Sequence, residues 1–83
     1  MKLKVYGGPI HYKGKQCRAI VATTSQKKVV ELFKNRKVRI SLYEICNYWC
    51  ETGNEKELKI ALAKPNTIFY NDKPFYNKEY MEL

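Results

Sequence analysis

Few side chains in this sequence could carry out nucleophilic or acid–base chemistry. His11 is the only histidine, and the three cysteines are Cys17, Cys46 and Cys50. No serine stands in a G-x-S-x-G context, and no glycine-rich loop of the Walker or dinucleotide type is present. A pairing of His11 with Cys17 across a hairpin is conceivable as a nucleophile and its base. An exposed histidine and a small buried cysteine explain the same residues, so we expect a binding protein and not an enzyme.

Metal binding has equally little support in the sequence. Cys46 and Cys50 are four residues apart, on neighbouring turns of an expected helix, but a zinc site usually needs four ligands and only Cys17 and His11 remain. We therefore expect no metal, no cofactor and free thiols, as in a reducing compartment. No apolar run approaches the roughly 20 residues of a membrane-spanning helix, so we expect a soluble protein that does not contact membranes.

Positive charge is the strongest chemical signal. The net charge is +8 over 83 residues, and residues 1–43 carry +10 whereas residues 44–83 carry −2. The bases are densest over residues 27–39, a pattern suited to phosphate-rich ligands or to acidic protein surfaces. A solvated helix face is the alternative, since exposed charges cost little. The dense bases are Lys27, Lys28, Lys34, Arg36, Lys37 and Arg39.

Aromatic residues accompany these bases. Seven tyrosines are difficult to bury together in so small a core, so some must reach the surface. An exposed ring beside Lys or Arg can stack on a nucleobase or anchor a protein interface, although tyrosines with solvated hydroxyls are the simpler explanation. The candidate ligand-binding residues are Lys13, Lys15, Arg18, Lys27, Lys28, Arg36, Lys37, Arg39, Tyr12 and Tyr43.

The elements that must position these residues begin with a β-hairpin. Residues 3–6 alternate as a half-buried strand, which the following Gly-Gly-Pro should interrupt or bulge. The extended pattern resumes, turns at Gly14 and returns as a strand over residues 17–22. Because Ile20 and Val21 are consecutive apolar residues, the return strand should be central and covered on both sides.

Capping residues mark two helices after the hairpin. A first helix is predicted over residues 26–35, with Thr24 or Ser25 as its cap. A second begins at Ser41, which precedes Glu44 by the spacing of a capping box. The inward stripe of this second helix comprises Leu42, Ile45, Cys46 and Trp49.

A third helix and a strand complete the predicted fold. Gly53 is expected in a left-handed conformation at the end of the second helix, and Asn54 with Glu57 repeats the capping-box spacing. Residues 67–70 form a further strand. The chain is thus predicted to be one α+β domain over residues 1–83, a small antiparallel sheet made by the N-terminal hairpin and a C-terminal strand, with three short helices on one face.

Three stretches of the chain resemble short hypothetical proteins of phages and prophages. The stretches are C-R-A-I-V-A at residues 17–22, S-Q-K-K at residues 25–28 and Y-W-C-E-T-G-N at residues 48–54. In that group a strand, a helix and a Y-W-x-E-T-G-N box follow in the same order, and the likeness spans roughly residues 3–70. The resemblance implies an origin in a mobile element and a place in the host cytoplasm, but it brings no activity with it. Small non-enzymatic proteins of such elements often sequester a nucleotide signal or cover a defence protein.

The leading hypothesis is a phage-type counter-defence protein that captures a phosphate-bearing ligand, a nucleotide messenger or a nucleic acid, through a basic, tyrosine-rich surface. The alternatives are a DNA- or RNA-binding regulator of the mobile element and a protein-directed inhibitor of a host defence enzyme. The first two helices resemble a helix-turn-helix in outline, but Glu44 and Glu51 on the second would repel phosphates. A binding pocket at a subunit boundary is compatible with the sequence, and would make the protein a homo-oligomer.

Overall fold

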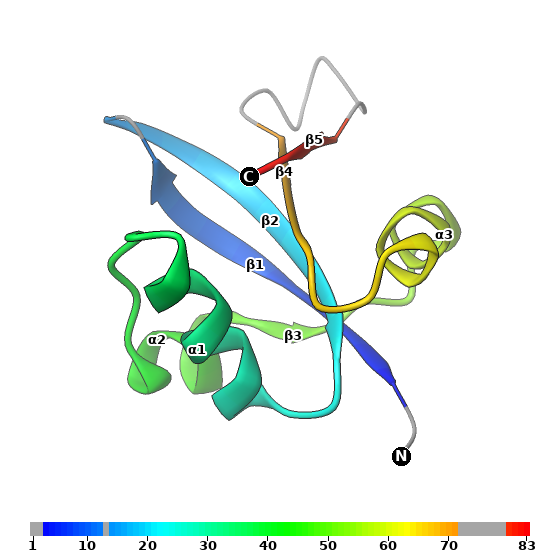
Figure 1. Cartoon of the computed structure of the whole chain (residues 1–83), viewed down its shortest axis with the longest axis horizontal. Coiled ribbons are helices and arrows are strands. Elements are labelled where there is room, and N and C mark those ends of the chain that lie inside the picture. The colour runs from blue at the N-terminus through cyan, green and yellow to red at the C-terminus, as the bar shows by residue number, and fades with distance from the viewer. Residues whose placement is uncertain (1–2, 13, 72–79) are drawn as a thin grey trace.

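The computed structural model describes residues 3–12, 14–71 and 80–83. The chain forms a five-stranded antiparallel sheet, of order β3-β1-β2-β4-β5, with three helices (Figure 1). The elements are β1 (Lys4–Tyr12), β2 (Lys15–Thr23), α1 (Gln26–Asn35), α2 (Leu42–Tyr48), β3 (Cys50–Glu51), α3 (Glu55–Ala63), β4 (Ile68–Asn71) and β5 (Met81–Glu82). The predicted α+β class, with an N-terminal hairpin and a C-terminal strand in one sheet, is confirmed. The two-residue edge strand β3 was not predicted, whereas the sequence left open a final strand such as β5.

Strand β1 continues through Gly-Gly-Pro, so the predicted interruption is wrong. The carbonyl oxygen of Val5 accepts a hydrogen bond from the amide of Thr52 at 2.9 Å, so Val5 directs its backbone groups toward the β3 side. Backbone direction alternates along a strand, and Pro9 therefore faces the same side as Val5. Because β3 pairs only with Tyr6 and Gly7, Pro9 lies beyond its end, and its missing N–H costs no ladder hydrogen bond.

Gly8 and Trp49 pack directly against each other. A Cβ atom at Gly8 would lie 2.4 Å from Cγ of Trp49, closer than any ordinary contact. The indole is 4% exposed, so its predicted burial is confirmed, and it meets Phe33 edge to face with ring centroids 5.5 Å apart. Its Nε1 donates to the carbonyl oxygen of Pro9 at 3.1 Å. The ring therefore fixes the end of α2 to β1.

The helices cover both faces of the sheet, which corrects the expectation that all three lie on one face. Val21 of β2 belongs to the apolar cluster that contains Phe33 of α1 and Ile45 of α2. Its neighbour Ile20 packs in a second cluster with Ala61 of α3. Since adjacent side chains of a strand point to opposite faces, α3 lies across the sheet from α1 and α2, and it stands apart from them in Figure 1.

Side-chain caps start each helix where the sequence predicts. The Ser25 hydroxyl accepts from the amide of Lys28 at 3.2 Å, and Ser41 accepts from Glu44 at the same distance. Asn54 Oδ1 accepts from the first-turn amides of α3. Within the described ranges no helix is long and apolar enough to cross a membrane.

The second helix is shorter than predicted. It ends at Tyr48, and Gly53 does not adopt a left-handed conformation because β3 separates it from the helix. Two turns bury little surface, so Leu42 remains 39% exposed and Cys46 is exposed as well. Of the predicted inward stripe, only Ile45 and Trp49 are buried.

Candidate functional site

A shallow basic pocket of about 280 Å³ lies at the end of α1. Its lining consists of Val30, Lys34, Lys37, Val38, Arg39 and Ile40. The three cations among these residues are exposed, and within the described part of the chain no ion pair engages any of them. The pocket therefore combines an apolar lining with unpaired positive charge, a combination that suits an anionic ligand.

The backbone that presents Lys37 is a Schellman helix stop. The amide of Val38 donates to the carbonyl of Phe33 at 3.0 Å, and the amide of Lys37 donates to that of Lys34 at 3.1 Å. Lys37 has a φ of 59°, in the left-handed region that glycine usually occupies at this position. This reversal lets residues before and after the helix end, Lys34 and Arg39, line the same pocket.

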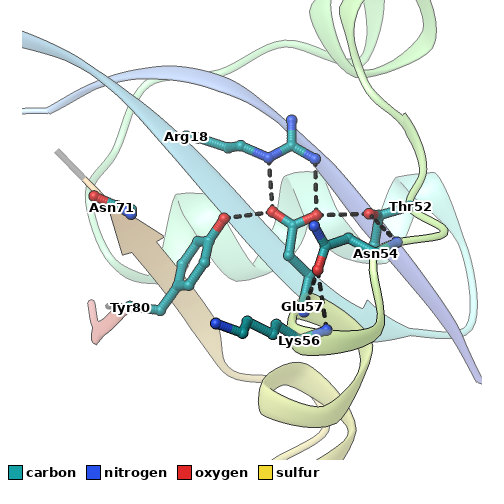
Figure 2. Close-up of a pocket in the computed structure, with 7 residues that line it drawn as sticks. All are labelled: Arg18, Thr52, Asn54, Lys56, Glu57, Asn71 and Tyr80. Carbon is teal, nitrogen blue, oxygen red and sulfur yellow. Dashed lines mark hydrogen bonds and ion pairs between the residues drawn. The ribbon is translucent and has the colours of Figure 1, made fainter. Parts of the chain in front are cut away.

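A second pocket, of about 330 Å³, lies beside α3 and surrounds a buried carboxylate (Figure 2). Glu57 is 5% exposed. The guanidinium of Arg18 donates to both of its oxygens, from Nε at 2.7 Å and from Nη2 at 3.1 Å. The Thr52 hydroxyl donates at 2.6 Å, and the Tyr80 hydroxyl donates to the other oxygen. Four donors therefore converge on one carboxylate, as Figure 2 shows.

The pKa values of Glu57 and Tyr80 in this cluster both lie far from neutral pH. Burial alone would raise the pKa of Glu57, but the hydrogen bonds from Arg18, Thr52 and Tyr80, with the charge of Arg18, lower it to about 2. Burial, and then the bond to Glu57, raises the pKa of Tyr80 to about 12. A general acid or base works best with a pKa near the operating pH, which neither group has. The cluster acts as a clamp that joins β2, α3 and the C-terminal segment.

Of the nine predicted binding residues that the structure describes, two, Lys37 and Arg39, line the basic pocket. Lys27 and Lys28 lie at the other end of α1, where Lys28 Nζ is 3.6 Å from a carboxylate oxygen of Glu31. The bases that are close in sequence therefore lie at opposite ends of α1.

The remaining predicted cations are also dispersed. Arg36 lines a separate cavity of about 220 Å³. Arg18 is held by Glu57 on the α3 side of the sheet, so its charge is already matched. Lys15 is exposed at the start of β2, and Lys13 lies outside the described residues.

The two predicted tyrosines have different surroundings. The ring of Tyr12 meets Tyr70 edge to face with centroids 5.0 Å apart, and it packs against the core beneath α1 and α2. Tyr43 is 69% exposed on α2 but lines none of the four pockets described here. Tyr12 therefore has a packing role, and Tyr43 is an exposed residue of α2 that does not line the candidate site.

From the sequence, Lys34 stands among the dense bases but not among the candidate ligand-binding residues, and Glu57 was not predicted as a pocket residue. Lys34 belongs to the basic run, and its spacing of three residues from Lys37 is a signal that they could share a surface. Glu57 stands three residues after Asn54, where a capping-box carboxylate is expected. Because that local role already explains the residue, nothing in the sequence indicated its hydrogen bonds to Arg18.

The conceivable nucleophile–base pair does not form. Cys17 pairs with Ile10 in the hairpin register and is buried, whereas His11 pairs with Gln16 and is exposed. Consecutive strand positions face opposite sides of the sheet, so the His11 and Cys17 side chains diverge. All three cysteines are free thiols. Across residues 3–12, 14–71 and 80–83, no three His, Cys, Asp or Glu side chains are grouped to hold a metal ion.

Comparison with protein-family models, curated proteins and solved structures found no match for this chain.

Proposed function

We propose that this protein is a non-enzymatic, phage-type counter-defence protein that captures a phosphate-bearing ligand, a nucleotide messenger or a nucleic acid, at the basic pocket. The observation that carries the proposal is the convergence of Lys34, Lys37 and Arg39 on one pocket without an ion-pair partner in the described part of the chain. A guanidinium binds phosphate oxygens in pairs and an ammonium adds a point charge, so the three can neutralise one phosphate group. The phage origin rests on the resemblance of residues 17–22, 25–28 and 48–54.

The conformation of Lys37 supports a binding role. A residue with a side chain in the left-handed region costs roughly 1–2 kcal/mol relative to ordinary helical backbone. Strained backbone of this kind is concentrated at binding and catalytic sites, where another requirement offsets it. At Lys37 (φ 59°) that requirement would be the positive charge, since glycine fits the turn better.

The small extent of the basic pocket favours a small phosphate ligand over a DNA- or RNA-binding regulator. A duplex reader presents a long basic stripe. Here Arg18 is neutralised by Glu57, and Arg36 lines a different cavity from Lys37. No specific contact favours the third candidate, an inhibitor of a host defence enzyme.

A salt series tests the proposal. The protein is titrated calorimetrically with AMP, single-stranded RNA and duplex DNA at several concentrations between about 50 and 200 mM salt. Duplex binding should weaken with a slope near −0.9 per neutralised phosphate, whereas a nucleotide with few charges should show a shallow dependence. Replacing the three pocket cations (Lys34→Ala, Lys37→Gly, Arg39→Ala) should weaken binding at least about tenfold, because charge-assisted hydrogen bonds are lost. Glycine is chosen at residue 37 because it keeps the turn.

A matched control separates a site from general attraction. Lys4, Lys27 and Lys59 are exposed and lie outside the pocket, so their triple alanine variant lowers the net charge by the same amount. The control should keep most of the affinity. Equal losses in both triple variants would show diffuse electrostatic attraction. If AMP, RNA and DNA all fail to bind at low salt, the phosphate proposal is wrong.

A further inference from the structure

Another cavity, of about 360 Å³ and distinct from the pocket around Glu57, adjoins the basic pocket and shares Arg39 and Ile40 with it. One wall is formed by Glu44 and Tyr48 of α2, and the other by residues 9–11 of β1 together with Gln16. Its volume is at the lower end of the roughly 300–1,000 Å³ of small-molecule sites. The two cavities meet at Arg39, so one ligand could occupy both.

The β1 wall offers a backbone donor and acceptor. Val5 directs its carbonyl toward the β3 side, and the register of β1 with β2 is continuous, so His11 directs its N–H and C=O to that same side. The end of β3 nearer to His11 is Cys50, which lies opposite Gly7, so β3 does not reach His11. The amide and the carbonyl of His11 therefore lie side by side at an open edge of the sheet. They are placed as they would be to pair with a neighbouring strand.

The α2 wall offers a ring and a carboxylate. Tyr48 is 63% exposed, and Glu44 precedes it by one helical turn, so both lie on the same face of α2. In the described part of the molecule, neither side chain makes a hydrogen bond or an ion pair. An exposed tyrosine can stack on a nucleobase, and a carboxylate accepts hydrogen bonds from an amino group of a base.

We infer that this cavity holds the base of a nucleotide whose phosphate occupies the basic pocket, and that it selects a base with an exocyclic amino group. The base stacks on Tyr48, its donor and acceptor edge pairs with the backbone of His11, and its amino group donates to Glu44. Arg39, at the junction, contacts the phosphate. This inference rests on the proposed phosphate site and names the class of ligand that it takes.

Calorimetric titrations with AMP, IMP and ribose 5-phosphate test the inference. All three carry one phosphate, so the basic pocket should bind each of them, with the affinity for all three reduced in the Lys34, Lys37 and Arg39 variant. AMP should bind at least about tenfold more tightly than ribose 5-phosphate, because stacking adds favourable free energy. AMP should also bind about tenfold more tightly than IMP. In IMP the carbonyl of hypoxanthine would face the Glu44 carboxylate, and two acceptors cannot form a hydrogen bond.

Variants of two tyrosines on α2 locate the base. Tyr48→Ala should remove the advantage of AMP over ribose 5-phosphate, whereas Tyr48→Phe should preserve it, since the ring is what stacks. Tyr43→Ala is the matched control, because Tyr43 is exposed on the same helix but does not line the cavity. Circular dichroism of each variant confirms that the fold is kept.

The outcomes separate this inference from the proposed function. If AMP, IMP and ribose 5-phosphate bind equally, and binding still requires Arg39, the base cavity is refuted while phosphate capture stands. If none of the three binds, both fail. If a short oligoadenylate binds more tightly than AMP and keeps its dependence on Tyr48, the same chemistry is supported with a nucleic-acid strand as its source. If AMP binds more tightly than the oligoadenylate, the source is a free nucleotide.

Discussion

Glu57 is the residue on which the α3 side of the molecule depends. Its carboxylate is buried and accepts hydrogen bonds from Arg18 of β2, from Thr52 before α3 and from Tyr80 near the C-terminus. These donors stand far apart in the sequence, so one side chain fixes the relative positions of three segments. The ionised form is strongly favoured in the fold because the bonds to it outweigh its burial.

Acid should reveal the contribution of Glu57 to stability. Its pKa falls from 4.5 to about 2 on folding, so its stabilisation is complete above pH 4.5 and is lost as the pH falls toward 2. Glu57→Gln should therefore lower the free energy of unfolding by about 2 kcal/mol at neutral pH, and the difference from the wild type should shrink toward zero near pH 2. Urea unfolding at a series of pH values measures this difference. A gap that stays constant with pH would show that packing, and not ionisation, is responsible.

At the scale of elements, the turn from α2 into β3 is held by Trp49. The indole covers Gly8, bonds to the carbonyl of Pro9 and meets Phe33 of α1. This arrangement places α2, and with it Tyr48, against the open edge of β1. The geometry of the proposed base cavity therefore depends on one buried ring.

Replacing that ring should cost far more stability than replacing its neighbour. Trp49→Ala removes a large buried side chain and should lower the free energy of unfolding by about 3–5 kcal/mol. Tyr48→Ala should change it by no more than about 0.5 kcal/mol, because the ring is exposed. Thermal or urea unfolding of both variants provides the measurement. If Trp49→Ala retains the wild-type stability and loses only ligand binding, the indole is a binding residue and not part of the core.

Local signals predicted the helix starts, but not the partners of each element. Ser25, Ser41 and Asn54 cap helices through bonds to amides two or three residues away, so the pattern is visible in the sequence. The side of the sheet that α3 covers depends on which strand residues it meets, and both Ile20 and Val21 are apolar. Glu57 fits a capping box equally well, so its long-range bonds were not predictable.

Across the whole molecule, the two faces of the sheet differ in whether their charged side chains form ion pairs. On the α3 face, Arg18 and Glu57 neutralise each other in a bonded cluster. Beside α1 and α2, Lys34, Lys37 and Arg39 remain without ion-pair partners in the described chain. The sequence indicated that residues 27–39 are basic, but only the helix stop at Lys37 shows which of these bases share a pocket.

The most direct test of the proposed site is a nuclear magnetic resonance titration of the ¹⁵N-labelled protein with AMP. The largest amide shifts should fall on Lys34 and on residues 37–40, which line the basic pocket, with further shifts at His11 and Tyr48 around the adjoining cavity. The amides of Arg18 and of residues 52–57, around the Glu57 cluster, should move little. Shifts concentrated around Glu57, or none with AMP in the millimolar range, would contradict a phosphate site at the end of α1.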